Sequence, residues 1–375
     1  NLLSRAAATS LPMTDDDSRD DIPAPTPDDF AEELPPLEGQ VIATPEATYV
    51  LRSDMRKDEI CNFYDAFMRI DQVNDTTHFR IEFEKVEGES CVMSKRMEME
   101  ATIRSVLLNG QSPASTNHIH VCDDLGAHSP WKFIVMPNYH LAVPKFLSEA
   151  DTEDKTKALF LRIAMNSFRG IETLHRIGII HGNIRPENFY IGTCMNGRKV
   201  AVANFQHATS VNREIPKGAE LIDMTYASRG RMRSYEACKK DDLESWLYCV
   251  AEFYHKELVP WVSDTKPTTS AEIASQARDI IKLKRAFCGR RMWKASKEVL
   301  FPEFDQILQL MLKTSGTSDP PYSQIWDCLA SAGVYMECAP FGLAPWMKTN
   351  NGAPTMASAF TCSPVPDVVE DYGSK

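Results

Sequence analysis

A change of residue pattern near residue 140 constrains the fold of this chain more than any other feature. Between residues 41 and 136, short runs rich in β-branched and aromatic residues alternate with polar ones, as in half-buried strands. From about Val143 onward, side chains of helical core type recur at three- and four-residue spacing, as at Phe160, Ile163, Ser167, Ile171 and Leu174. The order predicts an α+β fold with a small β-rich lobe followed by a larger helical lobe.

Individual elements can be placed within each lobe. The β-rich part is predicted to hold strands in ATYVLRS, ICNFYDAF, HFRIEFEKV, CVMSKRMEM and WKFIVMP. One helix, EATIRSVLLNG, interrupts them, with Ile103, Val106 and Leu107 on one face and Gly110 at its end. In the second part, DDLESWLYCVAEFYHKE and EFDQILQLMLKTS are predicted to be further apolar helices.

The two ends of the chain have a different composition. Residues 1–40 hold ten acidic residues against two arginines, and the sequence from Thr349 is rich in Pro, Ala, Ser and Thr. Such segments bury too little apolar surface to offset the entropy lost on ordering. The sequence therefore predicts disordered tails at 1–40 and 349–375, a β-rich lobe at 41–138 and a helical lobe at 139–348.

Net charge and cysteine usage limit the environment of the protein. The chain of 375 residues has a net charge of -11, which disfavours binding to nucleic acid or to an anionic membrane. Its ten cysteines form no C-x-x-C pair and fall within apolar stretches. We therefore expect buried thiols in a reducing compartment, the cytoplasm or the nucleus. No apolar run approaches the length of a membrane span.

The stretch HGNIRPENFYIG, from His181 to Gly192, lies between the long helix and a short hairpin pattern. Further along the chain come YASRGRMRSYEACKKDDLESWLYCVAEFYHKELVPW, LFPEFDQILQLM and APFGLAPW. In these stretches the chain resembles protein kinases of the casein kinase one group and, within that group, the tau-tubulin kinase branch. The similarity covers about residues 45–346. It implies a two-lobed protein kinase-like fold and a role in intracellular phospho-signalling.

The resemblance also shows which catalytic residues are changed. Asn183 stands where serine/threonine kinases have the aspartate that accepts the substrate proton, and a carboxamide is not a base near neutral pH. The Asp-Phe-Gly segment reads NFQ from Asn204, a neutral ligand where a divalent cation prefers an anion. Asn188 matches the second metal ligand, and Arg185 replaces the lysine of the loop. We therefore expect no intact catalytic set and no metal ion.

The nucleotide-covering loop has lost its glycines. In kinases this loop is glycine-rich, so that backbone N–H groups can approach the phosphates. The matching positions here are Arg56, Lys57, Asp58, Glu59, Ile60 and Cys61. Two acidic side chains in this loop would repel phosphate. With a hinge at Met136 and Pro137, the resemblance implies a former nucleotide site that binds neither ATP nor Mg²⁺.

A carboxylate occupies the position of the phosphate-holding lysine. The run FRIEFE places Glu82 there, and Glu100 matches the helix glutamate that pairs with that lysine in kinases. Two facing carboxylates would splay apart, share a proton, or take a positive charge from Arg80 or Lys85. The sequence leaves these three outcomes open.

Residues with a structural role in the resembled fold are kept. His181 and Phe205 match positions that pack the loop, and Asp242 matches a buried aspartate that accepts N–H bonds from the loop around His181. Basic residues then cluster after Ser228, at Arg229, Arg231, Arg233, Lys239 and Lys240. In the resembled group this region borders the substrate groove. The cluster is either a solvated basic loop or a docking site for acidic or phosphorylated peptides, the acidic N-terminal tail among them.

These observations predict one function and leave two alternatives open. The leading prediction is a pseudokinase, a catalytically inactive kinase-like domain that acts as a binding, scaffolding or allosteric module for a protein partner. The first alternative is a weak or unconventional serine/threonine kinase of the casein kinase one group. The second is a sensor that binds nucleotide without metal. The glycine-free loop favours the first prediction over both alternatives.

Overall fold

The computed structural model describes residues 39–52, 56–57, 62–70, 73–85, 92–110, 118–128, 131–137, 141–149, 157–194, 197–211, 224–233, 237–262, 270–289 and 302–335. The tails predicted at 349–375 and at 1–40, apart from residues 39 and 40, lie outside these ranges. Asp58–Cys61 of the former nucleotide loop also lie outside the described residues.

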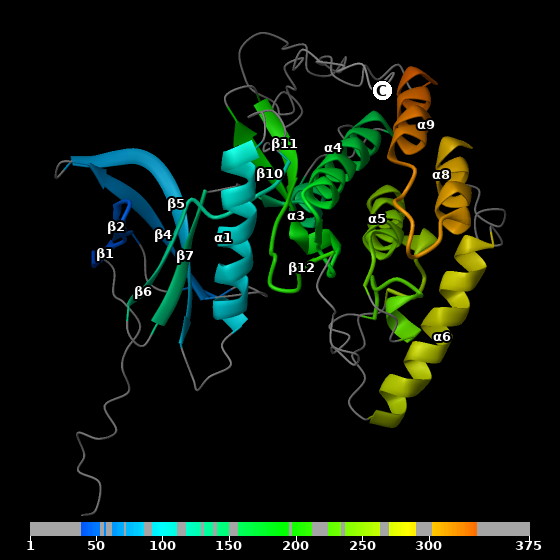
Figure 1. The fold of residues 1–375 in the computed structure, drawn as a ribbon, viewed down its shortest axis with the longest axis horizontal. Coiled ribbons are helices and arrows are strands. Elements are labelled where there is room, and N and C mark those ends of the chain that lie inside the picture. The colour runs from blue at the N-terminus through cyan, green and yellow to red at the C-terminus, as the bar shows by residue number, and fades with distance from the viewer. Residues whose placement is uncertain are drawn as a thin grey trace, which may run out of the picture. The chain divides into compact units, whose positions relative to one another are not determined.

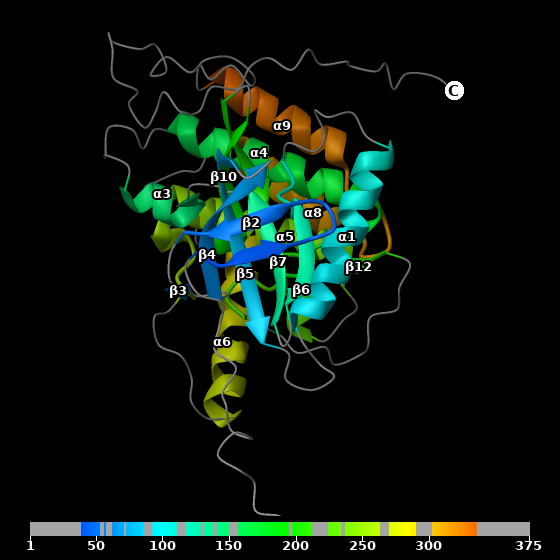
Figure 2. The same ribbon diagram turned by 90° about the vertical axis from the view of Figure 1, so that its left-hand side faces the viewer.

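The N-terminal lobe is built on an antiparallel sheet (Figures 1 and 2). Its strand order is β1-β2-β4-β5-β7-β6, and β3 pairs with β4. The strands are β1 (Val41–Ala43), β2 (Thr48–Leu51), β3 (Arg56–Lys57), β4 (Asn62–Ile70), β5 (Val73–Lys85), β6 (Asp124–His128) and β7 (Trp131–Pro137). The strands predicted in ATYVLRS, HFRIEFEKV and WKFIVMP are therefore confirmed as β2, β5 and β7, and that in ICNFYDAF is confirmed from Asn62 on.

Helix α1 (Val92–Gly110) packs against β5 and β7 and is longer than predicted (Figure 1). The prediction of a strand in CVMSKRMEM is wrong, because most of that run forms the first half of α1. The buried stripe of this helix comprises Arg96, Glu100, Ile103 and Leu107, at the spacing of one helical face. Two of its members are charged, so the apolar period is hidden in the sequence. Val106, predicted on this face, is instead 40% exposed.

The C-terminal lobe is mostly helical, as predicted. Its helices are α3 (Val143–Glu149), α4 (Lys157–Arg176), α5 (Lys239–Tyr254), α6 (Ser270–Cys288), α8 (Pro302–Lys313) and α9 (Tyr322–Tyr335), with 3-10 turns η3 (Pro186–Asn188), η4 (Arg231–Arg233) and η5 (Lys256–Leu258). A small sheet joins β8 (Leu141–Ala142), β10 (Phe189–Cys194) and β11 (Gly197–Val202), and a second pairs β9 (Ile179–Ile180) with β12 (Thr209–Ser210).

Helices α4 and α5 lie side by side in the core of this lobe (Figure 1). Phe168 of α4 contacts Trp246 of α5 with ring centroids 5.1 Å apart. The indole N–H of Trp246 donates to Ser167 Oγ at 2.9 Å, so the one polar residue of the predicted α4 face is satisfied. Ile163, Ile171 and Leu174 on that face are buried as predicted, and Phe160 is half-buried.

The segment after α1 is tied to the helical lobe. His120 N–H donates to the carbonyl of Val202 in β11 at 2.8 Å, and Val202 N–H donates to the carbonyl of His118 at 2.9 Å. A Cβ at Gly170 of α4 would lie 2.4 Å from that His118 carbonyl. Glycine at this position therefore allows three elements to meet closely.

The structure describes the side chains of five of the cysteines. Cys122, Cys238, Cys249, Cys288 and Cys328 are free, and all but Cys238 are buried. In the described part of the chain, no helix has both the length and the apolar character needed to cross a membrane.

Candidate functional site

The segment from His181 to Gly192 follows α4 and β9 and runs into β10, the first strand of the β10–β11 hairpin. Its start is held by the pairing of β9 with β12. Gly182 has φ 75°, and a Cβ there would lie 2.7 Å from the carbonyl oxygen of His207. Both the left-handed backbone and the close approach therefore require glycine at this position.

Asp242, in the first turn of α5, anchors the backbone of this loop. Its carboxylate accepts hydrogen bonds from the backbone N–H of His181 at 2.7 Å and of Gly182 at 2.9 Å. It also lies 3.0 Å from His175 Nε2, and His175 Nδ1 lies 2.8 Å from the hydroxyl of Tyr322. Burial would raise the pKa of Asp242, but the contacts with His175 and the loop N–H hold that pKa below its ordinary value.

The side chain of Asn188 links the backbone of Asn183 to the side chain of Asn204 in a chain of hydrogen-bonded amides. Asn188 Nδ2 donates to the backbone carbonyl of Asn183 at 2.8 Å, and Asn204 Nδ2 donates to Asn188 Oδ1 at 3.2 Å. Because Asn188 uses its amino group on a carbonyl, its oxygen faces Asn204 and fixes the orientation of both amides. Asn204 has φ 68°, and its buried Oδ1 has no hydrogen bond among the described residues.

This amide chain does not fit the magnesium ion that kinase-like sites use. Mg²⁺ is held in proteins by one or two carboxylates, whereas Asn188 and Asn204 are neutral and bonded to each other. The side chain of Asn183 cannot take up a proton near neutral pH. Within the described ranges, no three His, Cys, Asp or Glu side chains converge in a way that could hold a metal ion.

Phe205 and His181 pack together beneath the loop. Their rings are edge to face with centroids 5.5 Å apart, and both side chains are fully buried. Burial lowers the pKa of His181, whose Nε2 lies 2.9 Å from the carbonyl of Ala203. In the same loop, Arg185 Nε donates to Glu187 at 2.6 Å. The positive charge expected at Arg185 is therefore paired within the loop.

The two carboxylates predicted to face each other, Glu82 and Glu100, are bridged by an arginine. Arg96 Nη1 lies 2.5 Å from Glu82, and Arg96 Nε lies 3.5 Å from Glu100. Arg80 also contacts Glu82, at 3.0 Å, as one predicted alternative requires. Lys85 follows Glu82 by three positions in β5, so it faces the other side of the sheet.

Glu100 lies in an environment that favours its neutral form. Burial raises its pKa to about 7, even though Arg96 and the backbone N–H of Cys122, at 2.9 Å, favour the charged form. The nearby carboxylate of Glu82 raises this pKa further. The Glu100 carboxyl therefore titrates near neutral pH.

An aromatic–cation stack lies on the sheet face that carries Glu82. Strand register places Phe63 opposite Glu82, so both side chains share one face with Arg80. The Arg80 guanidinium lies 3.8 Å from the centre of the Phe63 ring, and that of Arg56 lies 5.0 Å from it. Of the predicted loop residues, Arg56 and Lys57 thus form strand β3. Side chains of the protein itself fill this face.

The predicted hinge residues Met136 and Pro137 end strand β7. Met136 is opposite Arg80 in the register of β5 and β7, and its sulfur lies 4.0 Å from Arg96 Nη2. Met136 is buried. The contacts of Arg96 therefore extend from Glu82 and Glu100 to the end of β7.

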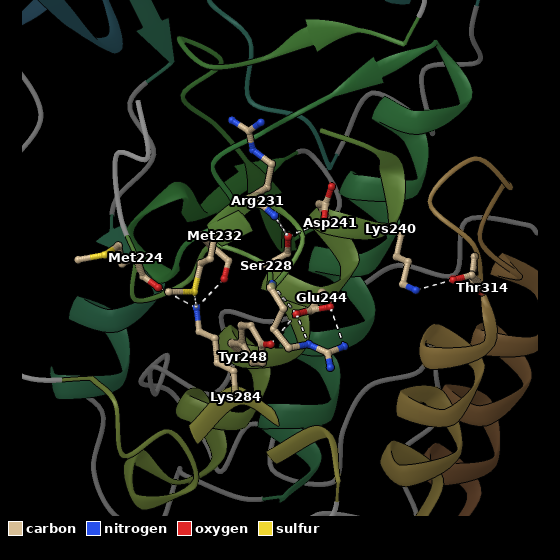
Figure 3. Close-up of polar contacts among 12 residues, drawn as sticks. Met224, Ser228, Arg231, Met232, Lys240, Asp241, Glu244, Tyr248, Lys284 and Thr314 are labelled. Atoms are coloured by element: carbon tan, nitrogen blue, oxygen red, sulfur yellow. Dashed lines mark hydrogen bonds and ion pairs between the residues drawn. The ribbon is translucent and has the colours of Figure 1, made fainter. Parts of the chain in front are cut away.

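The backbone of the segment before η4 is held by two donors from the helical lobe. Lys284 Nζ of α6 donates to the carbonyls of Met224 at 2.7 Å and Ala227 at 2.5 Å (Figure 3). Trp261 Nε1 donates to the carbonyl of Thr225 at 2.9 Å. Three carbonyls of this short segment are therefore satisfied by side chains far along the chain.

Side chains of the same segment are held by α5 (Figure 3). Ser228 Oγ donates to Asp241, and the backbone N–H and Nε of Arg229 donate to Glu244 at 2.7 and 2.9 Å. Glu244 also accepts from the hydroxyl of Tyr248 at 2.7 Å. These bonds hold the pKa of Glu244 below its ordinary value, although burial alone would raise it. Arg229 is thus committed to an internal ion pair.

Two further members of the predicted basic cluster have partners in the helical lobe. Lys239 Nζ lies 2.6 Å from Asp319, and Lys240 Nζ donates to the carbonyl of Thr314 (Figure 3). Of the predicted docking candidate, Arg229 and Lys239 are thus each paired with a carboxylate, and Lys240 is hydrogen-bonded to a backbone carbonyl.

The 3-10 turn η4 carries the other two basic residues. Arg231 N–H donates to Ser228 Oγ at 3.0 Å, and Arg233 N–H donates to the carbonyl of Gly230 at 3.0 Å. The Arg231 side chain is half-buried and extends away from the Ser228–Asp241 contact (Figure 3), whereas Arg233 is exposed. Arg231 and Arg233 of the predicted docking candidate are thus carried on one turn.

Sequence reasoning missed Arg96 and Lys284. Arg96 precedes Glu100 by four residues, which is the spacing of a helical ion pair, but the run around it was interpreted as a strand. Lys284 lies between Ile280 and Phe287 at helical spacing, and all three are buried. A single cation within an apolar stripe was the available signal for a buried, hydrogen-bonded lysine.

Comparisons with known proteins find similarity to serine/threonine-protein kinases. No family model matches the chain. It is 25% identical over 162 residues to ZK507.1 of Caenorhabditis elegans, which carries the name of a serine/threonine-protein kinase. The matched stretch is 41% of this chain and 49% of that one. It is 26% identical over 181 residues to the serine/threonine-protein kinase spe-6 of Caenorhabditis elegans, 46% of each chain. With the mouse serine/threonine-protein kinase VRK3 it shares 20% identity over 237 residues, 60% of this chain and 50% of that one.

The matched regions span between 37% and 49% of the first three curated relatives. Among solved structures, that of vaccinia related kinase 3 superposes with a TM-score of 0.61 at 16% identity, covering 82% of this chain and 94% of the other. At 16% identity, this likeness is evidence for the fold alone. The chain has a two-lobed, protein kinase-like α+β fold.

Proposed function

We propose that this chain is a pseudokinase of the casein kinase one group, similar to its tau-tubulin kinase branch, that binds an acidic or phosphorylated peptide and transfers no phosphate. The observation that carries the proposal is the charge inversion in the cleft. Where a kinase has a lysine that holds phosphate, this chain has Glu82, buried and paired with Arg96 and Arg80. Its charge is taken up by two guanidinium groups, and the position offers no ammonium group to hold the phosphates of a nucleotide.

Two further observations support the loss of phosphoryl transfer. The amides of Asn188 and Asn204 are bonded to each other in place of a metal-binding carboxylate, and Asn183 offers no base. The Arg80 guanidinium covers Phe63 on the same sheet face as Glu82. No step of a phosphoryl transfer is assigned to this chain, because its residues do not fit ATP or Mg²⁺.

The proposal of peptide binding rests on what the structure keeps. The segment that ends in η4 is tethered by Lys284, Asp241 and Glu244, and it carries Arg231 and Arg233, two positions apart, on one turn. Guanidinium groups bind phosphate and carboxylate through paired hydrogen bonds. A phosphorylated or acidic peptide is therefore the ligand that suits this turn. The free thiols favour the cytoplasm or the nucleus as its place of action.

A phosphoryl-transfer assay tests the central claim. Purified protein is incubated with radiolabelled ATP and Mg²⁺ or Mn²⁺, with casein as the acceptor. The expected incorporation equals that of an Asn188→Ala, Glu100→Ala double variant prepared in the same way. Incorporation by the wild type that this variant lacks would overturn the proposal and favour an unconventional serine/threonine kinase.

A thermal titration separates the sensor alternative. With millimolar ATP, with or without Mg²⁺, we expect the melting temperature to change by less than about 1 °C, since a ligand at 100 times its Kd would stabilise by about 2.7 kcal/mol. A larger, metal-independent shift would show that the cleft binds nucleotide and that the chain is a sensor.

A further inference from the structure

Lys284 of α6 is fully buried, and its ammonium group is aimed at the segment before η4 (Figure 3). Nζ donates to the carbonyls of Met224 and Ala227 and lies 3.6 Å from the sulfur of Met232. These three residues span both sides of Ser228, the residue that leads into η4. One side chain therefore contacts the segment before and after its bend.

The surroundings of Lys284 suit a buried cation. Its Nζ lies 4.9 Å from the centre of the Tyr248 ring and 5.9 Å from that of Trp261, and aromatic faces attract cations. The Tyr248 hydroxyl bonds to Glu244, which also binds Arg229. Burying an ammonium is costly unless it is hydrogen-bonded and compensated. The carbonyls and aromatic rings around Lys284 provide that compensation.

The contacts of Lys284 control where the peptide-facing turn lies. Two carbonyls three residues apart can converge on one donor only if the backbone between them bends. That bend places Ser228 Oγ where it accepts from Arg231 N–H and donates to Asp241. The position of Lys284 is thus transmitted to Arg231 through two hydrogen bonds.

We propose that Lys284 is a positioning residue that holds the segment 224–233 in its peptide-binding conformation, through contacts that require neither a phosphate group on the segment nor a nucleotide in the cleft. This inference rests on the proposed peptide-binding function. It adds to that function a site that is permanently organised, with the organising group on a helix that carries none of the peptide-binding residues.

Amide hydrogen exchange tests the inference. In Lys284→Met, exchange in residues 225–233 is expected to rise about tenfold or more, because two carbonyls lose their donor, while exchange in α4 stays within about twofold of the wild type. Lys282→Met, a change to an exposed lysine of the same helix, is expected to alter neither. An unchanged segment, or an equal rise in α4, would overturn the proposal.

Peptide affinity gives the second readout. The probe is a fluorescent, Asp- and Glu-rich peptide with one phosphoserine, and its Kd is expected to rise about fivefold or more in Lys284→Met, in line with a disordered site. Wild-type affinity in a variant whose segment exchanges freely would overturn the positioning role. If the wild type itself fails to bind this peptide, the proposed function is wrong, while the exchange data still decide whether Lys284 orders the segment.

A second variant covers the case in which Lys284→Met fails to fold. Lys284→Gln keeps an N–H donor on a shorter, uncharged side chain. Its expected exchange in residues 225–233 lies above that of the wild type and rises more than exchange in α4. Exchange equal to that of the wild type in this variant would also overturn the proposal.

Discussion

Two buried carboxylates, Asp242 in the helical lobe and Glu100 in the β-rich lobe, have opposite pKa shifts. Both side chains are almost wholly inaccessible, at 2% and 0%, so burial favours the neutral form of each. Asp242 accepts two backbone N–H bonds and contacts His175, and its pKa is lowered. Glu100 accepts one backbone N–H and has a guanidinium at 3.5 Å, and its pKa is raised to about 7.

The contrast identifies which region keeps its original chemistry. Around Asp242 the number of donors matches a permanent negative charge, as a structural anchor requires. Around Glu100 the donors are fewer, and the position that holds a lysine in kinases carries the carboxylate of Glu82. Under the proposed function, the helical lobe is a retained scaffold, whereas the cleft of the β-rich lobe is a rewired charge network.

The largest expected effect on the free energy of unfolding comes from removing the carboxylate of Asp242. Asp242→Ala leaves the loop N–H groups and His175 without their acceptor, and we expect it to lower the free energy of unfolding by about 3–5 kcal/mol. Asn183→Ala, which keeps the backbone bonds of that residue, should cost less than about 1 kcal/mol. Urea denaturation of both variants measures the difference.

The reverse order would break the comparison. If Asn183→Ala were the more damaging variant, the side chain of Asn183 would have a specific role in the cleft, and the helical lobe would not be the more constrained region. Binding of the acidic phosphopeptide should follow the same order as stability.

The next effect concerns the rewired network. Arg96→Met keeps most of the side-chain volume but leaves Glu100 without a cation, while Glu82 keeps Arg80. We expect a loss of about 2–4 kcal/mol in the free energy of unfolding. Lys95→Met, at an exposed position of the same helix, is the matched control and should cost less than about 0.5 kcal/mol. Equal effects of the two variants would show that the Arg96 bridge contributes nothing.

The fold of the helical lobe could be predicted from sequence because its core is apolar and strictly periodic. The stripe through Ile163, Ile171 and Leu174 has no competing interpretation. The start of α1 could not be predicted in this way, since Arg96 and Glu100 occupy its buried face. The bridge between Glu82 and Glu100 was missed for the same reason, because without that helix Arg96 has no defined direction.

Long-range pairing explains why the sequence alone could not show the contacts of the basic cluster. Residues after Ser228 were grouped by their closeness in sequence, but the partners of Lys239 and Lys240 lie at Asp319 and Thr314. The Arg229–Glu244 pair depends on a turn that brings the segment back onto α5. Charge alone in the sequence does not show whether a basic residue faces solvent or holds two loops together.

A pH experiment sharpens the comparison through Glu100. Its pKa is raised from 4.5 to about 7 in the folded state, so the folded protein binds the proton more tightly than the unfolded chain. The contribution of Glu100 to the free energy of unfolding is therefore present below about pH 4.5 and lost as the pH rises to about 7. In Glu100→Gln this loss is absent. We expect the variant to gain about 1–3 kcal/mol relative to the wild type between pH 5 and pH 8, measured by urea denaturation at each pH. A constant difference between the two proteins would mean that Glu100 is ionised throughout this range.

The smallest expected effect on stability comes from the turn that faces the peptide. Arg231→Glu with Arg233→Glu should change the free energy of unfolding by less than about 0.5 kcal/mol, because Arg233 is exposed and the contact of Arg231 with Ser228 uses its backbone N–H. Binding of the acidic phosphopeptide should nevertheless be abolished, and wild-type affinity should fall as salt rises from 50 to 300 mM, since exposed charges are screened over roughly 10 Å. Lys282→Glu with Lys313→Glu makes the same change in net charge at exposed positions of α6 and α8 and should leave binding intact. If both double variants bind equally well, the turn is a solvated basic surface, and the retained scaffold presents its ligand site elsewhere.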